Sequence, residues 1–388
     1  MKSSLIAMSL GTLGLGIAEF IMPGILSYVA NDLDISITTA GHLISAYALG
    51  VCFGAPIILL SVENFRLKNV LLFLAGLIFL GNFLAAISVN YYMLLVARFV
   101  SGLPHGAYFG VASIMAAKLA DRGKSSTAVA IMVAGMTVAN LVGVPAGTFL
   151  SENFSWHTIF FGVCGVAAAI FFAIKIFVPD IDNEITPKLS DRFKFLKHGA
   201  PWLLLVGTMF GNCGIFCYYS YINPLLVNVS DFEHSQLSWI MVVAGVGMVA
   251  GNLISGRICD RYAPGLVAAL TQAMEAVLLI GAFYFSNKSL LSVALMFGLT
   301  FCLFALSSPQ QLSIIRYSKG GEKLGAALIQ VAFNLGNAVG AAAGGLPIDA
   351  GFPENYCAIV GIPFAFLGFC AHGYFHYRYE VKRQRIID

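Results

Sequence analysis

In the first half of the chain, three ionisable side chains lie deep inside long apolar stretches, and the first of them is Glu19. It lies about fourteen residues into a stretch that begins near residue 5, which is ~21 Å deep in a helix that rises 1.5 Å per residue. An ionised carboxylate near the middle of a bilayer costs at least a few kcal/mol, so this group favours taking up a proton. Glu19 is therefore a candidate proton carrier and substrate contact. The alternative is a carboxylate held permanently by Arg98 or by hydroxyl groups as part of the structure.

The other two ionisable groups, Arg98 and His105, lie in one apolar stretch, residues 92–117. His105 is about halfway along it, and an imidazole with an unperturbed pKa of about 6.5 can exchange a proton near neutral pH. We expect a proton-coupling or substrate role for His105, with simple packing as the alternative. Arg98 lies seven residues earlier, roughly 10 Å away. It is a candidate counter-charge to Glu19 or gating contact, and otherwise a structural hydrogen-bond hub.

Uncharged polar residues gather in the apolar stretches of the second half of the chain. Amides and phenols donate and accept hydrogen bonds without a charge preference, which suits a hydroxyl-rich or heteroaromatic solute. Asn334 is the foremost candidate, because Gln330 and Asn337 share its helix face. For each residue the alternative is a hydrogen bond between helices. With Glu19 and His105, the predicted substrate-binding residues are Asn140, Tyr218, Asn223, Gln310, Gln330, Asn334 and Asn337.

The elements that must position these groups are membrane-spanning helices. The chain of 388 residues is 59% hydrophobic and 11% charged, with a mean hydropathy of +0.84, unlike a soluble domain. Apolar segments of about 20 to 26 residues recur, and each can cross ~30 Å of hydrocarbon as a helix. The predicted spans are 5–30, 38–60, 69–88, 92–117, 127–150, 158–178, 200–228, 237–257, 265–286, 290–314, 324–348 and 356–377.

Lysine and arginine fall almost entirely on one side of these spans, and Lys288 is the exception. The positive-inside rule then places both termini in the cytoplasm. The net charge of +3, without a basic run, argues against a nucleic-acid partner. The eight cysteines lack metal or redox spacing and are predicted to be apolar fillers, with no metal site. We expect no cleaved signal peptide.

The longest polar break divides the chain into residues 1–178, a cytoplasmic linker at 179–198, and residues 199–388. A shift of 197 residues supports two related halves of six spans each. The residues that it matches are Gly14 with Gly211, Gly50 with Gly247, Gly54 with Gly251, Glu63 with Asp260, Asn140 with Asn337, Gly143 with Gly340 and Gly147 with Gly344.

Three motifs fit a known family. The loop after residue 255 contains Gly256, Asp260 and Arg261, the G-x-x-x-D-R spacing of a cytoplasmic loop signature, whereas the first half has Leu59, Glu63 and Asn64 instead. The stretch 127–150 contains Gly135, Gly143, Pro145 and Gly147, similar to a glycine and proline motif of antiporters. These features, with Arg98 and Gly102 in an R-x-x-x-G pattern, resemble the major facilitator superfamily, in particular its twelve-helix drug:H⁺ antiporter branch with the bacterial arabinose and sugar efflux permeases.

The resemblance implies an all-α fold of twelve transmembrane helices in two pseudo-symmetric bundles, working by alternating access. Ala18-Glu19-Phe20, Pro104-His105-Gly106 and Phe333-Asn334 are similar to the sugar-efflux branch, in which an acid, a histidine and an asparagine line the central cavity. The implied function is proton-coupled efflux of a small, sugar-like solute across the bacterial inner membrane. A polyspecific drug exporter, a purine or nucleoside exporter and a proton-independent facilitator remain alternatives.

The resemblance also bears on Glu275, because the ninth span is a peripheral supporting helix in this superfamily. We therefore expect a structural or snorkelling role for Glu275. No nucleophile, metal or phosphate-loop pattern of an enzyme is present in the sequence. The expected partners are solute, protons and lipid, with a monomer as the default and no cofactor besides the proton gradient.

Overall fold

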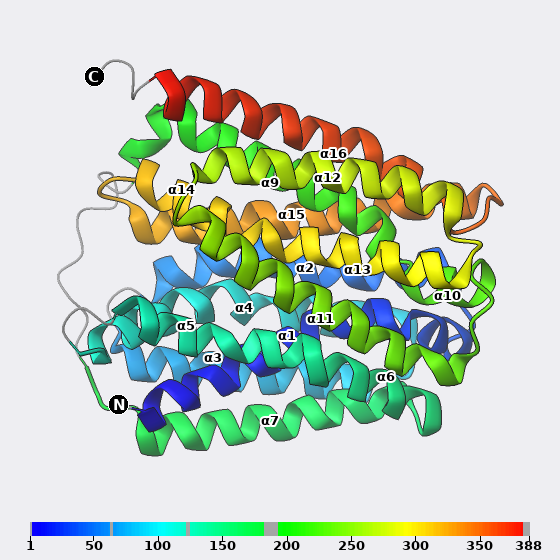
Figure 1. Cartoon of the computed structure of the whole chain (residues 1–388). Coiled ribbons are helices and arrows are strands. Elements are labelled where there is room, and N and C mark those ends of the chain that lie inside the picture. Colours follow the sequence, from blue (N-terminus) through cyan, green and yellow to red (C-terminus); the bar gives the residue numbers. More distant parts are fainter. Residues whose placement is uncertain (1, 63–64, 122–124, 182–192, 383–388) are drawn as a thin grey trace. The chain divides into compact units, whose positions relative to one another are not determined.

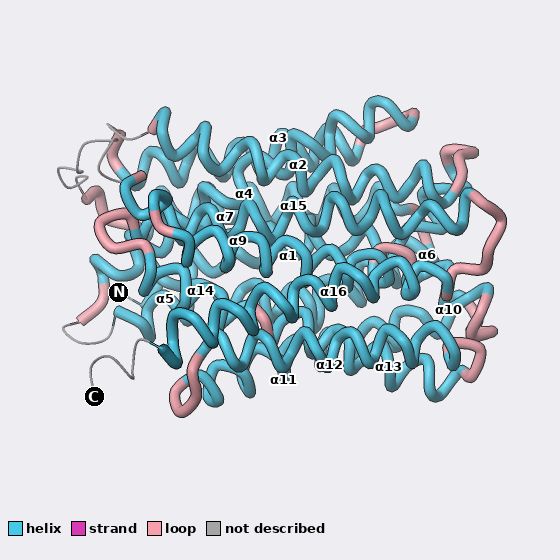
Figure 2. The backbone as a smooth tube through the Cα atoms, turned by 90° about the horizontal axis from the view of Figure 1, so that it is seen from above, coloured by secondary structure: helices cyan, strands magenta, loops and turns pink. Residues whose placement is uncertain are grey.

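The computed structural model describes residues 2–62, 65–121, 125–181 and 193–382, without the side chains of residues 125–127 and 323. Its ordered elements are helices, and the loops of each unit gather at the helix ends (Figure 2). The chain divides into two compact units, Met1–Thr186 and Pro187–Asp388, which we describe separately.

The first unit is built around α1, which contacts α2, α4, α5, α6 and α7 (Figure 1). Most of the length of α1 is buried, including Glu19. The bounds of its elements are α1 Lys2–Asp32, α2 Ile37–Ser61, α3 Leu67–Ala86, α4 Tyr91–Leu119, α5 Ser125–Val138, the π-helix η1 Ala139–Gly143, α6 Val144–Asn153 and α7 Trp156–Phe177.

Side-chain caps fix where several of these helices begin. The Ser36 hydroxyl accepts a hydrogen bond from the Thr39 N–H at 3.1 Å, and the Asn90 side-chain Oδ1 atom accepts one from the Met93 N–H at 2.9 Å. Such caps satisfy N–H groups that have no partner inside the first turn of a helix. They set where α2 and α4 begin, and therefore the positions of Tyr47 and His105 along the axes of these helices.

In the second unit, α9 takes the central place and packs along α15 and α16. The adjacent helix α12 packs against α16 and α13. The bounds are η2 Lys194–Lys197, α9 Gly199–Tyr219, α10 Ile222–Asn228, α11 His234–Cys259, α12 Pro264–Phe285, α13 Ser289–Ala305, α14 Ser307–Tyr317, α15 Glu322–Asp349, α16 Tyr356–Phe375 and the π-helix η3 His376–Val381.

Eleven helical segments of the described residues are long and apolar enough to cross a membrane. Helix α4 is the predicted span that is not among them, although it has 29 residues. Arg98, Ser101 and His105 lower its hydropathy, but all three side chains are buried. The hydropathy of α4 therefore reflects polar groups that face the protein interior.

Three predicted spans are not the uninterrupted α-helices that the sequence suggested. The span 127–150 contains the π-helical turn η1, the span 200–228 breaks at Ser220 and Tyr221, and the span 290–314 breaks at Leu306. The Tyr221 hydroxyl donates to the Ala341 carbonyl at 2.7 Å, which ties the second break to α15. Tertiary contacts of this kind have no counterpart in a hydropathy profile.

Glycines matched by the 197-residue shift occupy matching places in the two units. In four of the five glycine pairs the Cα lies so close to a neighbouring helix that a Cβ would collide with it. Gly50 and Gly54 of α2 meet the Phe99 and Leu103 carbonyls of α4, Gly247 and Gly251 of α11 meet the Phe297 and Phe301 carbonyls of α13, Gly143 and Gly147 meet Ile17 and Ile21 of α1, and Gly340 and Gly344 meet Cys213 and Cys217 of α9.

Candidate functional site

The first unit brings Glu19 of α1 and His105 of α4 together in its interior. Glu19 is 8% exposed and His105 is 2% exposed. The His105 Nε2 atom lies 3.7 Å from the Glu19 Oε2 atom, within ion-pair distance if the imidazole is protonated. The two predicted proton-coupling groups are thus neighbours, and a proton on either one changes the charge felt by the other.

Tyr47 of α2 orients the imidazole. Its hydroxyl is 2.9 Å from His105 Nδ1, and the ring of Phe109 stacks on the imidazole at a centroid distance of 5.2 Å. The same hydroxyl lies 3.4 Å from the Leu15 carbonyl, to which it can donate. When it does so, Nδ1 donates to Tyr47 and Nε2 is left as an acceptor facing Glu19. When Tyr47 donates to Nδ1, Nε2 carries a hydrogen instead. The phenol therefore selects which side of the imidazole is the base.

Arg98 is fully buried beside this pair. Its guanidinium donates to the Ala18 carbonyl at 2.7 Å and to the Leu43 carbonyl at 3.4 Å, and it lies 4.5 Å from the centre of the Tyr47 ring. Its charge also interacts with Glu19, and its Nη2 atom has no hydrogen-bond partner among the described residues. Arg98 thus places a positive charge near Glu19 and hydrogen-bonds the backbones of α1 and α2, and its role as counter-charge, gating contact or structural hub stays a prediction.

Tyr47→Phe tests the phenol's part in this arrangement. The variant leaves His105 Nδ1 without its partner in a buried site, so we expect the free energy of unfolding to fall by about 1–3 kcal/mol. Reversible unfolding in mixed detergent micelles measures this change. Tyr92→Phe is the matched control, because Tyr92 lies on the same helix as His105 and is 76% exposed. Equal stability of the two variants would contradict the assignment.

The predicted antiporter motif forms the face that α5 and α6 turn toward α1. Gly135, Gly143 and Gly147 each lie where a Cβ would strike α1, and Pro145 is buried in the first turn of α6. Asn140 lies inside the π-helical turn, 2% exposed, with its side-chain N–H donating to the Met136 carbonyl and its Oδ1 atom unpaired among the described residues. π-Helical turns are frequent at functional sites.

The polar candidates of the second unit lie near its helix breaks and on α15. Tyr218 and Asn223 flank the break between α9 and α10, and Gln310 follows the break that begins α14. On α15, Asn334 and Asn337 are buried and Gln330 is half-buried, with the Asn334 side chain donating to the Gln330 carbonyl at 3.1 Å. The predicted stripe on α15 therefore occupies one face of that helix.

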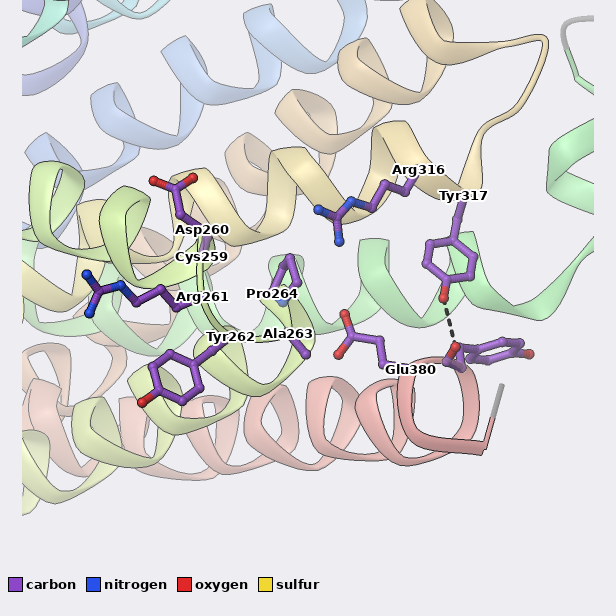
Figure 3. A pocket seen from close by; sticks show the side chains of 10 residues that line it. Cys259, Asp260, Arg261, Tyr262, Ala263, Pro264, Arg316, Tyr317 and Glu380 are labelled. Atoms are coloured by element: carbon purple, nitrogen blue, oxygen red, sulfur yellow. Dashed lines mark hydrogen bonds between the residues drawn. The ribbon is translucent and has the colours of Figure 1, made fainter. Parts of the chain in front are cut away.

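The loop between α11 and α12 holds the residues of the G-x-x-x-D-R signature. Asp260 and Arg261 point in different directions, and no hydrogen bond joins them in the described chain (Figure 3). They line an open cavity of about 420 Å³ together with Arg316 and Glu380. Gly256 lies one turn earlier on α11. The corresponding Glu63 and Asn64 of the first half lie outside the described residues.

The C-terminal segment also lines this cavity, through Tyr379 and Glu380. Glu380 of η3 accepts a hydrogen bond from the Gly265 N–H at 3.0 Å, which satisfies a free donor in the first turn of α12. The Tyr317 hydroxyl donates to the Tyr379 carbonyl at 2.9 Å, the bond drawn in Figure 3. The segment after α16 thus makes hydrogen bonds with the start of α12 and with the end of α14.

A family model described as the Major Facilitator Superfamily matches residues 8–341 of the chain, with a second match over residues 208–385. The chain belongs to the major facilitator superfamily. Its relatives include "Putative transporter AraJ" of Escherichia coli (strain K12), 44% identical over 388 residues, which are 100% of this chain and 98% of the relative. "Inner membrane transport protein YdhP" of Escherichia coli O157:H7 is 33% identical over 359 residues, 92% of each chain.

A more distant relative is named "Probable sugar efflux transporter" in Helicobacter pylori (strain P12). It is 25% identical over 335 residues, which are 85% of this chain and 84% of the relative. The family and these names make this facilitator a multi-pass membrane transport protein and not an enzyme. The sequence-based assignment to this superfamily and to the neighbourhood of sugar efflux permeases is confirmed.

Two features of this facilitator were missed or misjudged from its sequence. Tyr47 was not a candidate, although a phenol midway along an apolar span is a signal that could have found it. The snorkelling role considered for Glu275 is wrong, because its side chain is 0% exposed. A snorkelling side chain must bring its charged end to the membrane surface, whereas Glu275 points between helices of its own unit.

Proposed function

We propose that this facilitator exports a sugar-like solute in exchange for protons. The observation that carries the proposal is the buried pair of Glu19 and His105, 3.7 Å apart, with Tyr47 on the other side of the imidazole. A proton that enters this site neutralises Glu19 or charges His105, and either event changes which conformation is favoured. Export follows if the proton and the solute favour opposite conformations.

Alternating access of two six-helix bundles would carry the solute and the protons across the membrane in opposite directions. We count α4 as the twelfth span, because its 29 residues reach ~43 Å and its polar side chains are buried. The lysine and arginine distribution favours both termini in the cytoplasm, and the bacterial relatives favour the inner membrane. A monomer without a cofactor suffices for this cycle.

A hydroxyl-rich solute fits the uncharged amides of the second unit. Asn334 and Gln310 are buried, and each has a side-chain atom without a hydrogen-bond partner among the described residues. Such atoms are available to a ligand with both donors and acceptors. Asn140 offers a similar free oxygen in the first unit. The relative named "Probable sugar efflux transporter" supports the same class of solute.

Flux into proteoliposomes tests the proposal. Purified protein is reconstituted, a pH gradient is imposed, and the movement of radiolabelled pentoses, hexoses and a disaccharide is followed, with a nucleoside and a cationic dye in parallel. We expect sugar movement against its gradient that a proton ionophore abolishes. Sugar flux that does not depend on the pH gradient would instead indicate a proton-independent facilitator. Movement of the dye or the nucleoside alone would exclude a sugar exporter.

A further inference from the structure

Besides Glu19 of the first unit, a second buried carboxyl group, that of Glu275, lies inside the Pro187–Asp388 unit, where α9, α12 and α16 meet. Three glycines of α9 face three polar side chains in order along this line, which we call the polar seam. A Cβ on each glycine would collide with the side chain opposite. The facing pairs are Gly207 with His372, Gly211 with Gln272, and Gly214 with Glu275.

Two of the polar side chains of the seam, His372 and Gln272, are hydrogen-bonded to each other. The His372 Nδ1 atom is 3.0 Å from the Gln272 side-chain oxygen, and the Gln272 amide donates to the Gly207 carbonyl at 2.9 Å. All three polar side chains are 0% exposed. The glutamine and histidine therefore have a structural use, since they join α12 to both α9 and α16.

Glu275 differs, because neither of its carboxyl oxygens has a hydrogen-bond partner among the described residues. The groups that interact with it electrostatically are thiols, Cys213 and Cys217 of α9 and Cys302 of α13. On α16 the titratable neighbour along the seam is His372, whose Nδ1 is held by Gln272. In the described parts of α11 and α14, which also pack on α12, no charged group pairs with it.

An ionised carboxylate in such a place would lack both a hydrogen-bond donor and a counter-ion, which is among the costliest arrangements in a protein interior. A protonated carboxyl avoids that cost, and its O–H can donate. The Glu275 Oε1 atom and the Gly361 carbonyl oxygen lie near each other beside Gly214. An ideal Cβ built on Gly214 would be 2.8 Å from the first and 2.9 Å from the second. The second lone pair of that carbonyl is an acceptor that only the protonated form can use.

We propose that Glu275 is a second proton-binding site of this transporter, occupied while the polar seam is closed. The site is in the other unit from Glu19, and it does not depend on the proposed exchange of protons for sugar. Release of its proton requires water or a cation to reach the carboxylate, so α9, α12 and α16 must first separate along the seam. Glu275 is therefore protonated while the three helices are packed along the seam and can release its proton only when they separate.

Infrared spectroscopy of the reconstituted full chain tests the assignment. A protonated carboxyl gives a C=O stretching band that is separate from the amide and carboxylate bands and shifts in D₂O. We expect Glu275→Gln to remove such a band at neutral pH, and Glu19→Gln to leave that component in place. Glu275→Asp retains a carboxyl group and should shift the band, which identifies the site even if the glutamine variant folds poorly.

Two results would overturn the proposal. An unchanged carboxylic band in both Glu275 variants would show that the side chain is ionised in the closed seam. A band that appears only after sodium and potassium are removed would show that a metal cation occupies the site instead. Because neither measurement involves transport, failure of the proposed sugar export would leave this test unaffected.

The pH dependence of stability gives an independent measure. At Glu275 the folded protein holds a proton that the unfolded chain in water releases, so the contribution of this group to wild-type stability must fall as the pH rises from about 5 to about 8. The contribution of this one proton is up to about a tenfold rise in the unfolding equilibrium constant per pH unit. We expect Glu275→Gln to lose that component, and an identical pH dependence in both proteins would contradict the assignment.

Discussion

Glu19→Gln is expected to uncouple this transporter from the pH gradient. Glutamine is close to glutamate in size but cannot bind and release a proton in the relevant range, so a gradient can no longer act through this position. The ratio of sugar flux with a gradient to flux without one should fall to about 1, a loss of about tenfold or more in driven transport. The proteoliposome assay measures this ratio directly, and the amount of active protein cancels.

Glu354→Gln is the matched control for that experiment. Glu354 accepts a hydrogen bond from the Asn228 side chain at 2.6 Å at the exposed end of α10, and glutamine preserves an acceptor there. Its flux ratio should equal that of the wild type. If Glu19→Gln kept the full wild-type ratio, Glu19 would be excluded as the carrier, and the alternative of a permanently held structural carboxylate would be favoured.

Gly50→Ala and Gly251→Ala are expected to destabilise the protein strongly. Each glycine lies against a backbone carbonyl of the neighbouring helix, Phe99 in one unit and Phe301 in the other, so an added methyl group must push two helices apart. Overpacking of this kind typically lowers the free energy of unfolding by about 1–3 kcal/mol. Unfolding in mixed detergent micelles, followed by tryptophan fluorescence, measures the change.

Gly76→Ala provides the contrast, because no atom lies within 4 Å of a Cβ at that position of α3. Alanine is favoured over glycine in a helix interior by about 1 kcal/mol, so this variant should be as stable as the wild type or slightly more so. If all three variants behaved alike, the helix contacts at Gly50 and Gly251 could not be as close as the structure has them.

The long helices could be predicted because their length and apolarity follow from the thickness of a bilayer. For example, the predicted span 237–257 lies within α11, His234–Cys259. The breaks at Ser220 and Leu306 could not be predicted in the same way, since neither position is a proline or a glycine. They depend on contacts such as the hydrogen bond from Tyr221 to the Ala341 carbonyl, which join residues far apart in sequence.

The same distinction applies to the candidate site. Helical rise gives the depth of Glu19 and His105, and both were expected near mid-membrane. The direction in which each side chain points depends on how α1, α2 and α4 pack. The sequence therefore predicted neither the contact of Tyr47 with His105 nor the hydrogen bond from Arg98 to the Ala18 carbonyl. Glu275 was misjudged for a related reason, because the sequence did not reveal that glycines on α9 make room for its carboxyl group.

The π-helical turn at Ala139–Gly143 explains the unusual spacing of the glycines around it. In an α-helix, eight residues overshoot two turns by about 80°, so Gly135 and Gly143 would lie on different faces. One extra residue in a π turn takes up about 100°, which returns both glycines to within about 20° of a common line. Both do contact α1, at Ser9 and at Ile17. The motif therefore behaves as an α-helical pattern that has gained one residue, and deletion of that residue would restore a regular α-helix with Gly135 and Gly143 seven residues apart and still facing α1.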